Sequence, residues 1–195
     1  MALDATKVYA PTPDQSPTTG AVAVADVGVT PPTDARTALG SDWDDGGYVD
    51  ENGISLAVTR NTTPIRDWSK SVVRNLLTEY NGAVNCNFLQ VDEFSANRMF
   101  GEDNVTVTAA DRTHGVQMTV EIGSQLPPIE AFCFSMKDGD ARVRVFIPRG
   151  QFTDVNQIDF KPDAGNVIGG TIATYDDGTG HSIYVMYDDG VVVSG

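Results

Sequence analysis

The stretch AFCFSMKDGDARVRVFI, residues 131–147, decides the fold class of this chain. Its two ends, 131–135 and 141–147, are short apolar runs, and Asp138-Gly139-Asp140 lies between them. Short runs of β-forming residues on either side of a glycine-containing turn predict an antiparallel β-hairpin. We therefore expect this stretch to form two neighbouring strands of a sheet.

The same signals recur outside this hairpin, so the region from residue 41 onward is expected to consist mainly of strands. Further strands are predicted at 72–80, 84–90, 104–109, 116–122, 157–161 and 167–175. A final hairpin is predicted to join 171–175 to 182–187 through the glycine-rich turn 176–180. Many short strands with glycine-rich turns favour a β-sandwich or a β-barrel.

Residues 48–90 contain two turn signals and one polar segment. Asn52-Gly53 predicts a type I′ hairpin turn, because both central residues of such a turn need a positive φ. The run 54–59 alternates between apolar and small or polar residues, which predicts a strand with one buried face. The polar segment 61–70 contains a proline and is expected to be a loop, and Asn81-Gly82 is expected to separate two strands.

Two segments differ from the β pattern. Residues 92–100 have an acidic start and a late arginine, and a glycine follows them, which predicts a short α-helix. Residues 1–40 contain five prolines, which disfavour helix, so we expect an extended N-terminal arm in which 21–24 is a candidate strand. The predicted organisation is an arm, 1–40, followed by a β domain, 41–195, with a mainly β, sandwich- or barrel-like fold and one short α-helix.

The composition limits the function classes. The net charge is −14, from 27 acidic and 13 basic residues, which disfavours binding to nucleic acid or to anionic membranes. The first residues lack the basic and apolar regions of a signal peptide, and no apolar run is long enough for a membrane helix. We therefore expect synthesis in the cytoplasm. Cys86 and Cys133 lie in strand-like sequence and are expected to be buried thiols, not a disulfide.

The sequence contains no recognisable catalytic constellation. His114 and His181 lie in loop-like segments, and hydrolase and nucleotide-binding motifs are missing. The acidic loops at 42–46 and 176–178 lack the spacing of a calcium-binding EF-hand. Pairs of carboxylates arise by chance among 27 acidic residues, so they do not indicate a glycosidase. We expect no enzyme activity, no cofactor and no bound metal.

Acidic and basic residues are separated along the chain. Residues 42–51 hold five acids and no base, and residues 151–195 hold seven acids and one lysine, whereas 60–74 hold four bases and one acid. Separate patches of opposite charge favour head-to-tail contacts between copies, which build rings or open stacks. Solvated surface charge is the alternative interpretation. The basic residues expected at inter-subunit contacts are Arg60, Arg66, Lys70, Arg74, Arg142 and Arg144.

Several short motifs resemble the major tail-tube proteins of long-tailed, siphovirus-type bacteriophages, especially those that infect actinobacteria. The motifs are Trp43, Gly47–Val49, Glu51–Gly53, Arg60, Thr62–Ile65, Trp68, Val73-Arg74, Thr78–Tyr80, the predicted helix 92–100, Phe100-Gly101, Asp103–Val105, Ile147–Gly150 and Ile158–Phe160. The resemblance covers roughly residues 20–190, and the Pro- and Thr-rich segment 11–20 departs from it.

The resemblance implies a structural virion protein with a β-sandwich fold and one helix. It implies hexameric rings that stack into a helical tail tube, through whose acidic lumen DNA passes without specific binding during genome ejection. The implied partners are other copies of the chain, the tape-measure protein, the tail terminator and tail-tip proteins, with no membrane. Segments 1–40 and 60–74 are the expected links between rings. The candidates for the acidic lumen are Asp44, Asp45, Asp176, Asp177, Asp188 and Asp189.

Two alternatives stay open at the level of the sequence. One is another structural role, as a phage capsid decoration or head–tail joining protein. The other is a carbohydrate-binding β-sandwich module, which would need aromatic side chains on one exposed face. The candidates for that face are Trp43, Trp68, Tyr184 and Tyr187.

Overall fold

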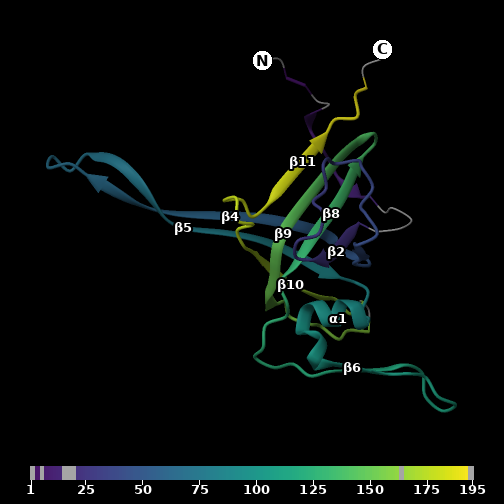
Figure 1. Ribbon diagram of the computed structural model, residues 1–195. Helices are drawn as coiled ribbons and strands as arrows, with labels where there is room; N and C mark the ends of the chain where they lie inside the picture. Colours follow the sequence, from purple (N-terminus) through teal and green to yellow (C-terminus); the bar gives the residue numbers. More distant parts are fainter. Residues whose placement is uncertain (1–2, 5–6, 15–20, 163–164, 193–195) are drawn as a thin grey trace.

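The structure is a computed structural model that describes residues 3–4, 7–14, 21–162 and 165–192. It is mainly β, with one short α-helix in the described part of the chain, which confirms the predicted fold class (Figure 1). The elements are β1 (Thr12–Pro13), β2 (Val22–Asp26), β3 (Asp44–Asp45), β4 (Val49–Arg66), β5 (Val72–Phe88), α1 (Glu93–Phe100), a 3₁₀ turn (Glu102–Asn104), β6 (Val105–Thr108), β7 (Gln117–Val120), β8 (Glu130–Asp138), β9 (Ala141–Val155), β10 (Ile168–Thr174) and β11 (Tyr184–Asp188).

The predicted hairpin of 131–147 is confirmed as β8 and β9, and it organises the main sheet. The two strands pair antiparallel from Asp138↔Ala141 outward. β9 is long enough to serve two neighbours on its other edge, because β11 pairs with Arg142–Phe146 and β10 with Gly150–Val155. The order along the sheet is β3-β2-β8-β9-β10-β5-β4, and β1 joins β8. β6 and β7 form a separate two-stranded sheet.

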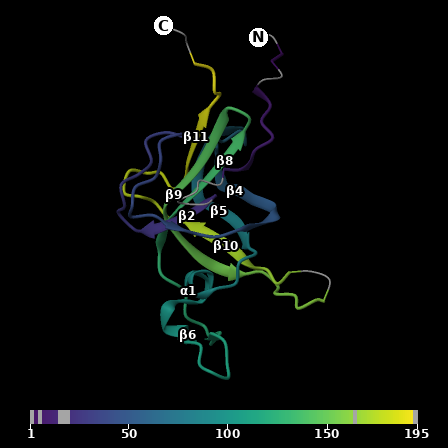
Figure 2. The same cartoon turned by 90° about the vertical axis from the view of Figure 1, so that its right-hand side faces the viewer.

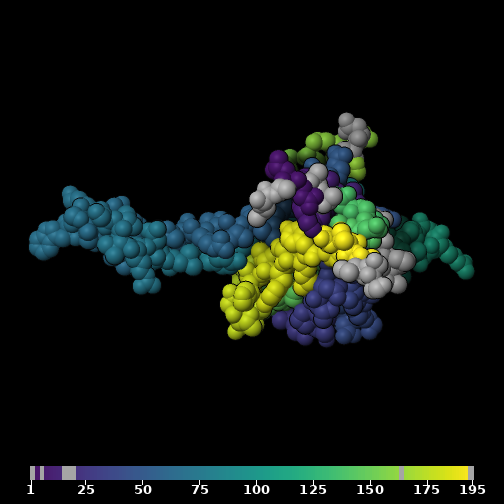
Figure 3. Space-filling model, turned by 90° about the horizontal axis from the view of Figure 1, so that it is seen from above, coloured from purple at the N-terminus to yellow at the C-terminus, as the bar shows by residue number. Residues whose placement is uncertain are grey.

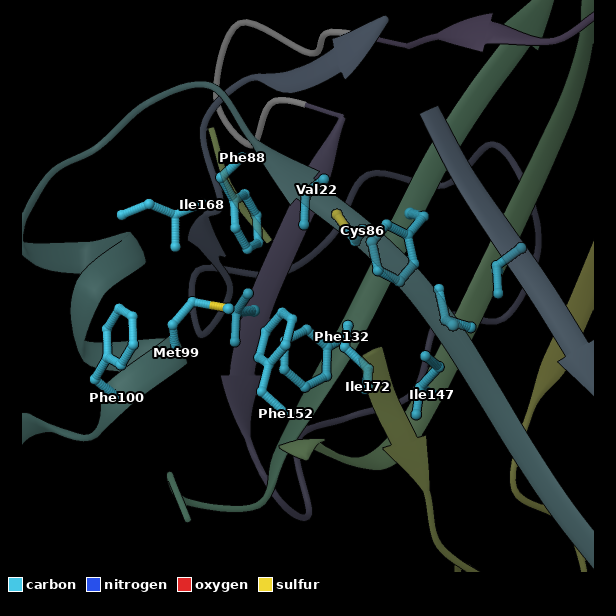
Figure 4. Packing of buried hydrophobic residues seen from close by; sticks show 14 residues of the cluster. Val22, Cys86, Phe88, Met99, Phe100, Phe132, Ile147, Phe152, Ile168 and Ile172 are labelled. Carbon is cyan, nitrogen blue, oxygen red and sulfur yellow. The ribbon is translucent and has the colours of Figure 1, made fainter. Parts of the chain in front are cut away.

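The main core lies where the sheet folds over on itself. β4 and β5 cross β8 and β9, and side chains from both halves meet between them (Figures 1 and 4). Phe152 lies at the centre of this cluster, in edge-on contact with Phe88 and Phe132 at centroid distances of 6.1 and 5.7 Å. Met99 and Phe100 of α1 close one end of the cluster. The burial of these large side chains is the main stabilisation of the fold.

A second, smaller core covers the opposite face of β2, β8 and β9. Trp43 packs edge-on against Phe146 at 6.0 Å, and Ala23 and Cys133 lie beside them. The chain between β2 and β3 folds back over this face and supplies Val29. β2 and the first half of β8 are therefore buried on both faces, which explains their continuous apolar sequence.

The strand predicted at 21–24 is confirmed as β2, which begins at Val22 and is buried along most of its length. β2 lies in the sheet between β3 and β8, and β1 pairs with β8, so the expected arm of 1–40 contains two strands of the main sheet. Residues 1–2, 5–6 and 15–20 of that arm lie outside the described residues. Figure 2 shows that the described N-terminal segment lies beside β11, at the end of the body opposite α1. Lys7 pairs with Asp189 at 2.5 Å, and the rings of Tyr9 and Tyr187 are 5.9 Å apart.

The sequence interpretation of 48–90 was wrong in four places. The run 54–59 is a strand, as predicted, but it has no buried face, because residues 55–59 are exposed. Asn52-Gly53 forms no hairpin turn but an irregularity within β4, where Val49 pairs with Phe88 and Ile54 with Cys86. Gly53 has φ 65°, so the glycine is needed for the bulge. The expected loop 61–70 is strand up to residue 66, and β5 runs through 81–82 without interruption. Pairing along one long hairpin satisfies the backbone groups of these polar residues and overrides their local turn preference.

Two predictions near the C-terminus were also wrong. Residues 157–161 form no strand, and β11 pairs with β9 instead of forming a hairpin with β10. Both edges of β10 are already occupied, by β5 and by β9, so β11 has no place beside it.

The predicted helix 92–100 is confirmed as α1. Asp92 caps its start in a capping box, in which the Asp92 carboxylate accepts from the backbone of Ser95 and the Ser95 hydroxyl accepts from the backbone of Asp92. Gly101 ends the helix with φ 89°. The buried residues of α1 face the sheet, so tertiary packing stabilises a helix too short to persist alone.

Candidate assembly surface

The β4–β5 hairpin projects far from the body of the molecule. Every residue from Ser55 to Asn81 is exposed, although both strands are paired along this length. Figures 1 and 3 show the hairpin extending to one side, and beyond its base no other described element lies against it. A two-stranded hairpin is marginally stable by itself in water. The described chain therefore presents an extended element that lacks a covering layer.

The exposed hairpin carries an apolar stripe that continues the core. Leu56 pairs with Val84, so both lie on the face that is buried at the base of the hairpin. Two residues further out, Val58 lies on the same face, and the next pair on it is Arg60 with Tyr80. The exposed large apolar side chains of the hairpin are Leu56, Val58, Ile65, Trp68, Val72, Val73, Leu76, Leu77 and Tyr80. Exposed apolar surface of this extent marks an interaction site.

The structure brings four of the six predicted basic residues together on this hairpin. Arg60 lies over the ring of Tyr80, 5.7 Å from its centroid, and Arg66, Lys70 and Arg74 lie toward the tip. None of the four forms an ion pair with a described residue. The acidic residue Glu79 is held by the amides of Asn81 and Asn61, which lower its pKa. The distal hairpin therefore combines apolar surface with unpaired positive charge.

The tip of the hairpin is tightly ordered. The Asp67 carboxylate accepts from the Ser69 hydroxyl and from the Ser71 backbone, each at 2.8 Å, and these bonds lower its pKa. Lys70 adopts φ 67°, and its carbonyl accepts a 2.9 Å bond from the Arg66 guanidinium. Within this turn the Trp68 side chain is fully exposed. A preorganised turn therefore displays a large aromatic ring to solvent.

The base of the hairpin is fixed to the body. The Tyr80 hydroxyl is 2.9 Å from the Ser182 hydroxyl. At Gly82 an added Cβ would lie only 2.4 Å from the Thr174 hydroxyl, so the strand can pass this close only as glycine. The orientation of the hairpin relative to the sheet is therefore set by packing at its base.

The two remaining basic candidates, Arg142 and Arg144, lie far from the hairpin on β9. Arg142 forms a 3.0 Å ion pair with Asp14. Arg144 is 5% exposed, and its guanidinium donates to the carbonyls of Asp34 and Thr37 at 2.7 and 2.9 Å. Both side chains hold N-terminal segments onto the sheet, so we leave them out of the assembly surface.

The six acidic candidates lie in three places. Asp44 and Asp45 form β3, and Asp44 is 3.8 Å from Arg98. Asp188 pairs with Arg36 and Asp189 with Lys7, each at 2.5 Å. Asp176 and Asp177 lie in the loop between β10 and β11. The candidates without an ion pair to a described residue are Asp45, Asp176 and Asp177.

A buried ion pair joins α1 to the sheet. Glu130 is 4% exposed and lies 2.9 Å from the Arg98 guanidinium. Burial raises the pKa of Glu130 to about 7, although Arg98 acts in the opposite direction, and Asp26, Glu102 and Asp44 add to the rise. One oxygen of Glu130 has no hydrogen-bond partner among the described residues.

No catalytic or metal centre is evident in the described part of the chain. No group of three or more His, Cys, Asp or Glu side chains there could hold a metal ion. His114 and His181 are exposed loop residues, as predicted. Cys86 and Cys133 are free and buried, also as predicted, and burial raises their pKa to about 12 and about 11. The described residues include no helix of the length and apolarity that a bilayer crossing requires.

The four aromatic residues proposed for a carbohydrate-binding face do not form one shared face. Trp43 is buried, and Trp68 lies at the hairpin tip, away from Tyr184 and Tyr187 on β11.

Sequence reasoning missed that 55–81 projects as one exposed hairpin with Trp68 at its tip. The available signal was the sequence 72–77, where the pairs Val72-Val73 and Leu76-Leu77 break the alternation of a half-buried strand. Adjacent apolar residues in a strand point to opposite faces, so the hairpin exposes apolar side chains on both of its faces.

Comparison with known proteins gives one clear result. The model of a protein family described as phage tail tube protein matches residues 11–193. No curated protein matches the chain.

Proposed function

The chain belongs to the phage tail tube protein family, a family of structural components of the virion tail, and on that premise we propose that its copies assemble as hexameric rings that stack into the tube. DNA crosses the channel of this tube on its way into the host. The long-tailed, siphovirus type and an actinobacterial host belong to the same proposal, as does synthesis in the host cytoplasm before assembly.

The projecting β4–β5 hairpin is the observation that carries this proposal. A single chain leaves both faces of residues 55–81 in water, including apolar side chains that continue the core stripe. Association removes that surface from water, which favours the assembled state by roughly 25 cal/mol for each Å² of apolar area buried. The hairpin therefore supports a subunit whose fold is completed by its neighbours.

A free sheet edge offers a second means of association. β4 is the last strand in the sheet order, so one edge of the described sheet has unpaired backbone groups along a long strand. The opposite end of the sheet is β3, which has only two residues. Addition of a neighbour's strand to β4 satisfies these groups and continues the sheet from subunit to subunit.

Charge favours the same head-to-tail arrangement. The hairpin presents Arg60, Arg66, Lys70 and Arg74 without ion pairs to described residues, whereas the chain as a whole has a net charge of −14. A basic projection on an acidic body attracts the body of the next copy. Heterologous contacts of this kind close into rings or extend as stacks.

The excess of acid also suits the proposed channel. A wall of carboxylates repels phosphate, so DNA moves along it without specific binding. Asp45 is the strongest candidate for this wall, because its charge is not offset by an ion pair to a described residue. Asp176 and Asp177 also lack such an ion pair, but Asp177 lines an apolar pocket on the body and Asp176 is its neighbour in sequence. By family, the further partners are the tape-measure, tail-terminator and tail-tip proteins, and the function requires no membrane.

Electron microscopy of the purified protein tests the proposal. We expect rings or tubes with a central channel for the unchanged chain. The double variant Arg66→Glu/Lys70→Glu should stay monomeric, because it reverses the charge of the tip. Its body should stay folded, because both residues are exposed, neither forms an ion pair with a described residue, and the bond from Arg66 to the Lys70 carbonyl lies within the tip itself. Arg112→Glu changes an exposed charge outside the hairpin and should leave tubes intact. An unchanged chain that stays monomeric at high concentration would contradict tube formation, and tubes of normal length in the double variant would contradict the role of the basic tip.

A further inference from the structure

We infer that Trp68 at the tip of the β4–β5 hairpin inserts into an apolar pocket on the outer face of β9 and β11 of a second copy. This inference rests on the proposed self-assembly and identifies its anchor and its receptor.

The tip has the properties of a binding anchor. Asp67 and Ser71 fix the turn through two bonds between them, a backbone bond of 2.9 Å and a bond to the carboxylate of 2.8 Å. The Trp68 side chain is nevertheless fully exposed, so the turn is ordered without any contribution from the ring. Buried tryptophans dominate the energetics of many protein interfaces, and a preorganised loop loses little conformational entropy on binding.

The pocket is apolar and large enough for an indole ring. Its volume is about 460 Å³, and it opens between the chain that follows β2 and the outer face of β9 and β11. The residues that form its apolar wall are Val29, Pro31, Pro32, Phe146, Tyr184 and Met186. Phe146 and Tyr184 stack at 6.0 Å, which gives the floor an aromatic surface. Aromatic, proline and methionine side chains are suited to contact with a tryptophan.

The occupant must come from another chain. The hairpin points away from the body, and Figure 3 shows its tip far from the face on which the C-terminal strand and the segment around residues 30–45 lie side by side. The base of the hairpin is fixed by the contact of Tyr80 with Ser182 and by the close passage at Gly82. The tip therefore cannot fold back onto its own pocket.

The charges at the two sites are complementary. Arg66 and Lys70 flank Trp68, while Asp177 lines the pocket and Asp176 precedes it. The Asp177 carboxylate accepts a 2.5 Å bond from the Tyr184 hydroxyl. Arg149 also lines the pocket, but its guanidinium is bound to the carbonyl of Asp176 at 3.2 Å. Asp177 in the pocket lining and its sequence neighbour Asp176 carry two negative charges against the single positive charge of Arg149, which favours binding of a basic tip.

Truncation of the anchor gives the first test. Trp68→Ala should raise the protein concentration required for assembly by about thirtyfold, the effect expected for loss of one interface hot spot, and Trp68→Phe should restore part of it. Phe160→Ala is the matched control, because Phe160 is another highly exposed aromatic, 79% exposed, and lies outside the hairpin. Blocking the pocket with Val27→Arg, at a half-exposed lining residue, should have the same effect as Trp68→Ala. Sedimentation and circular dichroism report assembly and folding separately.

Cross-linking within assembled tubes tests the contact itself. Both native cysteines are buried, so a short bis-maleimide should react only with introduced cysteines. Ser69→Cys with Val27→Cys should give cross-linked ladders between copies, and Ser69→Cys with Phe160→Cys should not. Tubes that form normally with Trp68→Ala, or that cross-link only through residue 160, would overturn this inference while the proposed function stands. If the unchanged chain forms no tube at all, both fail. The inference is supported if the Trp68→Ala protein stays monomeric and the Ser69→Cys/Val27→Cys protein gives cross-linked ladders between copies.

Discussion

Replacement of Glu130 by glutamine tests how the buried junction between α1 and β8 responds to pH. Glu130 is 4% exposed and contacts the Arg98 guanidinium at 2.9 Å. Burial nevertheless raises its pKa to about 7, against an ordinary value of 4.5. Glutamine has nearly the shape of the protonated side chain but does not titrate, so the pair of proteins isolates the effect of this one proton.

The expected magnitude follows from the two pKa values. Between pH 4.5 and 7 the folded chain keeps the Glu130 proton and the unfolded chain has lost it. The free energy of unfolding therefore falls by about 1.4 kcal/mol for each pH unit in this window. The stabilisation that comes from the bound Glu130 proton is fully present below pH 4.5 and is lost by pH 7, and it amounts to about 3 kcal/mol in total. Glu130→Gln should match the unchanged protein near pH 4.5 and exceed its stability by about that amount at pH 8.

Urea unfolding followed by tryptophan fluorescence measures this difference, because Trp43 is buried in the folded chain. The measurement is made in the Arg66→Glu/Lys70→Glu background, so that assembly does not add to the apparent stability. Arg98→Leu gives a second comparison, since a buried carboxylate without its cation should cost roughly 3–5 kcal/mol at pH 8 and much less at pH 4.5. Parallel pH profiles for Glu130→Gln and the unchanged protein would refute the reasoning and show that the ion pair outweighs burial.

Three further predictions concern the core, the helix and the thiols. Phe152→Ala should lower the free energy of unfolding by about 3–5 kcal/mol, since it empties a 2%-exposed site between two other phenyl rings, and thermal unfolding should show a fall in Tm of roughly 6–20 °C, whereas exposed Phe160→Ala should change it little. Asp92→Ala removes the cap of α1 and should cost about 1 kcal/mol in urea unfolding; an unchanged midpoint would refute the role of the capping box. Cys86 and Cys133 should resist a thiol reagent in the folded protein and react only after unfolding, because both are fully buried and their pKa values are raised; labelling of the native chain would contradict that burial.

The hairpin shows why part of the assembly surface could not be read from the sequence. The basic content of 60–74 is visible in the residues, and it is the reason that this segment was predicted to join subunits. The length and exposure of the hairpin are not visible in the sequence. Strand pairing between 55–66 and 72–81 is a contact between residues distant in the chain, and the local turn signals of 61–70 favour a loop instead. Arg144 shows the opposite case: alternation places it on a strand face, but only the fold brings the carbonyls of Asp34 and Thr37 to its guanidinium.

By itself the sequence determined the local features of this protein: the hairpin of 131–147, the helix of 92–100 with its cap and closing glycine, the strand at 21–24 and the burial of both cysteines. These features depend on residue type and on neighbours within a few positions, so local physical chemistry specifies them. Only the tertiary structure decided which strands are neighbours, that β9 carries both β10 and β11, and that the β4–β5 hairpin leaves the body with Trp68 at its tip. Strand order and register depend on burial across the whole chain, which a one-dimensional pattern does not contain.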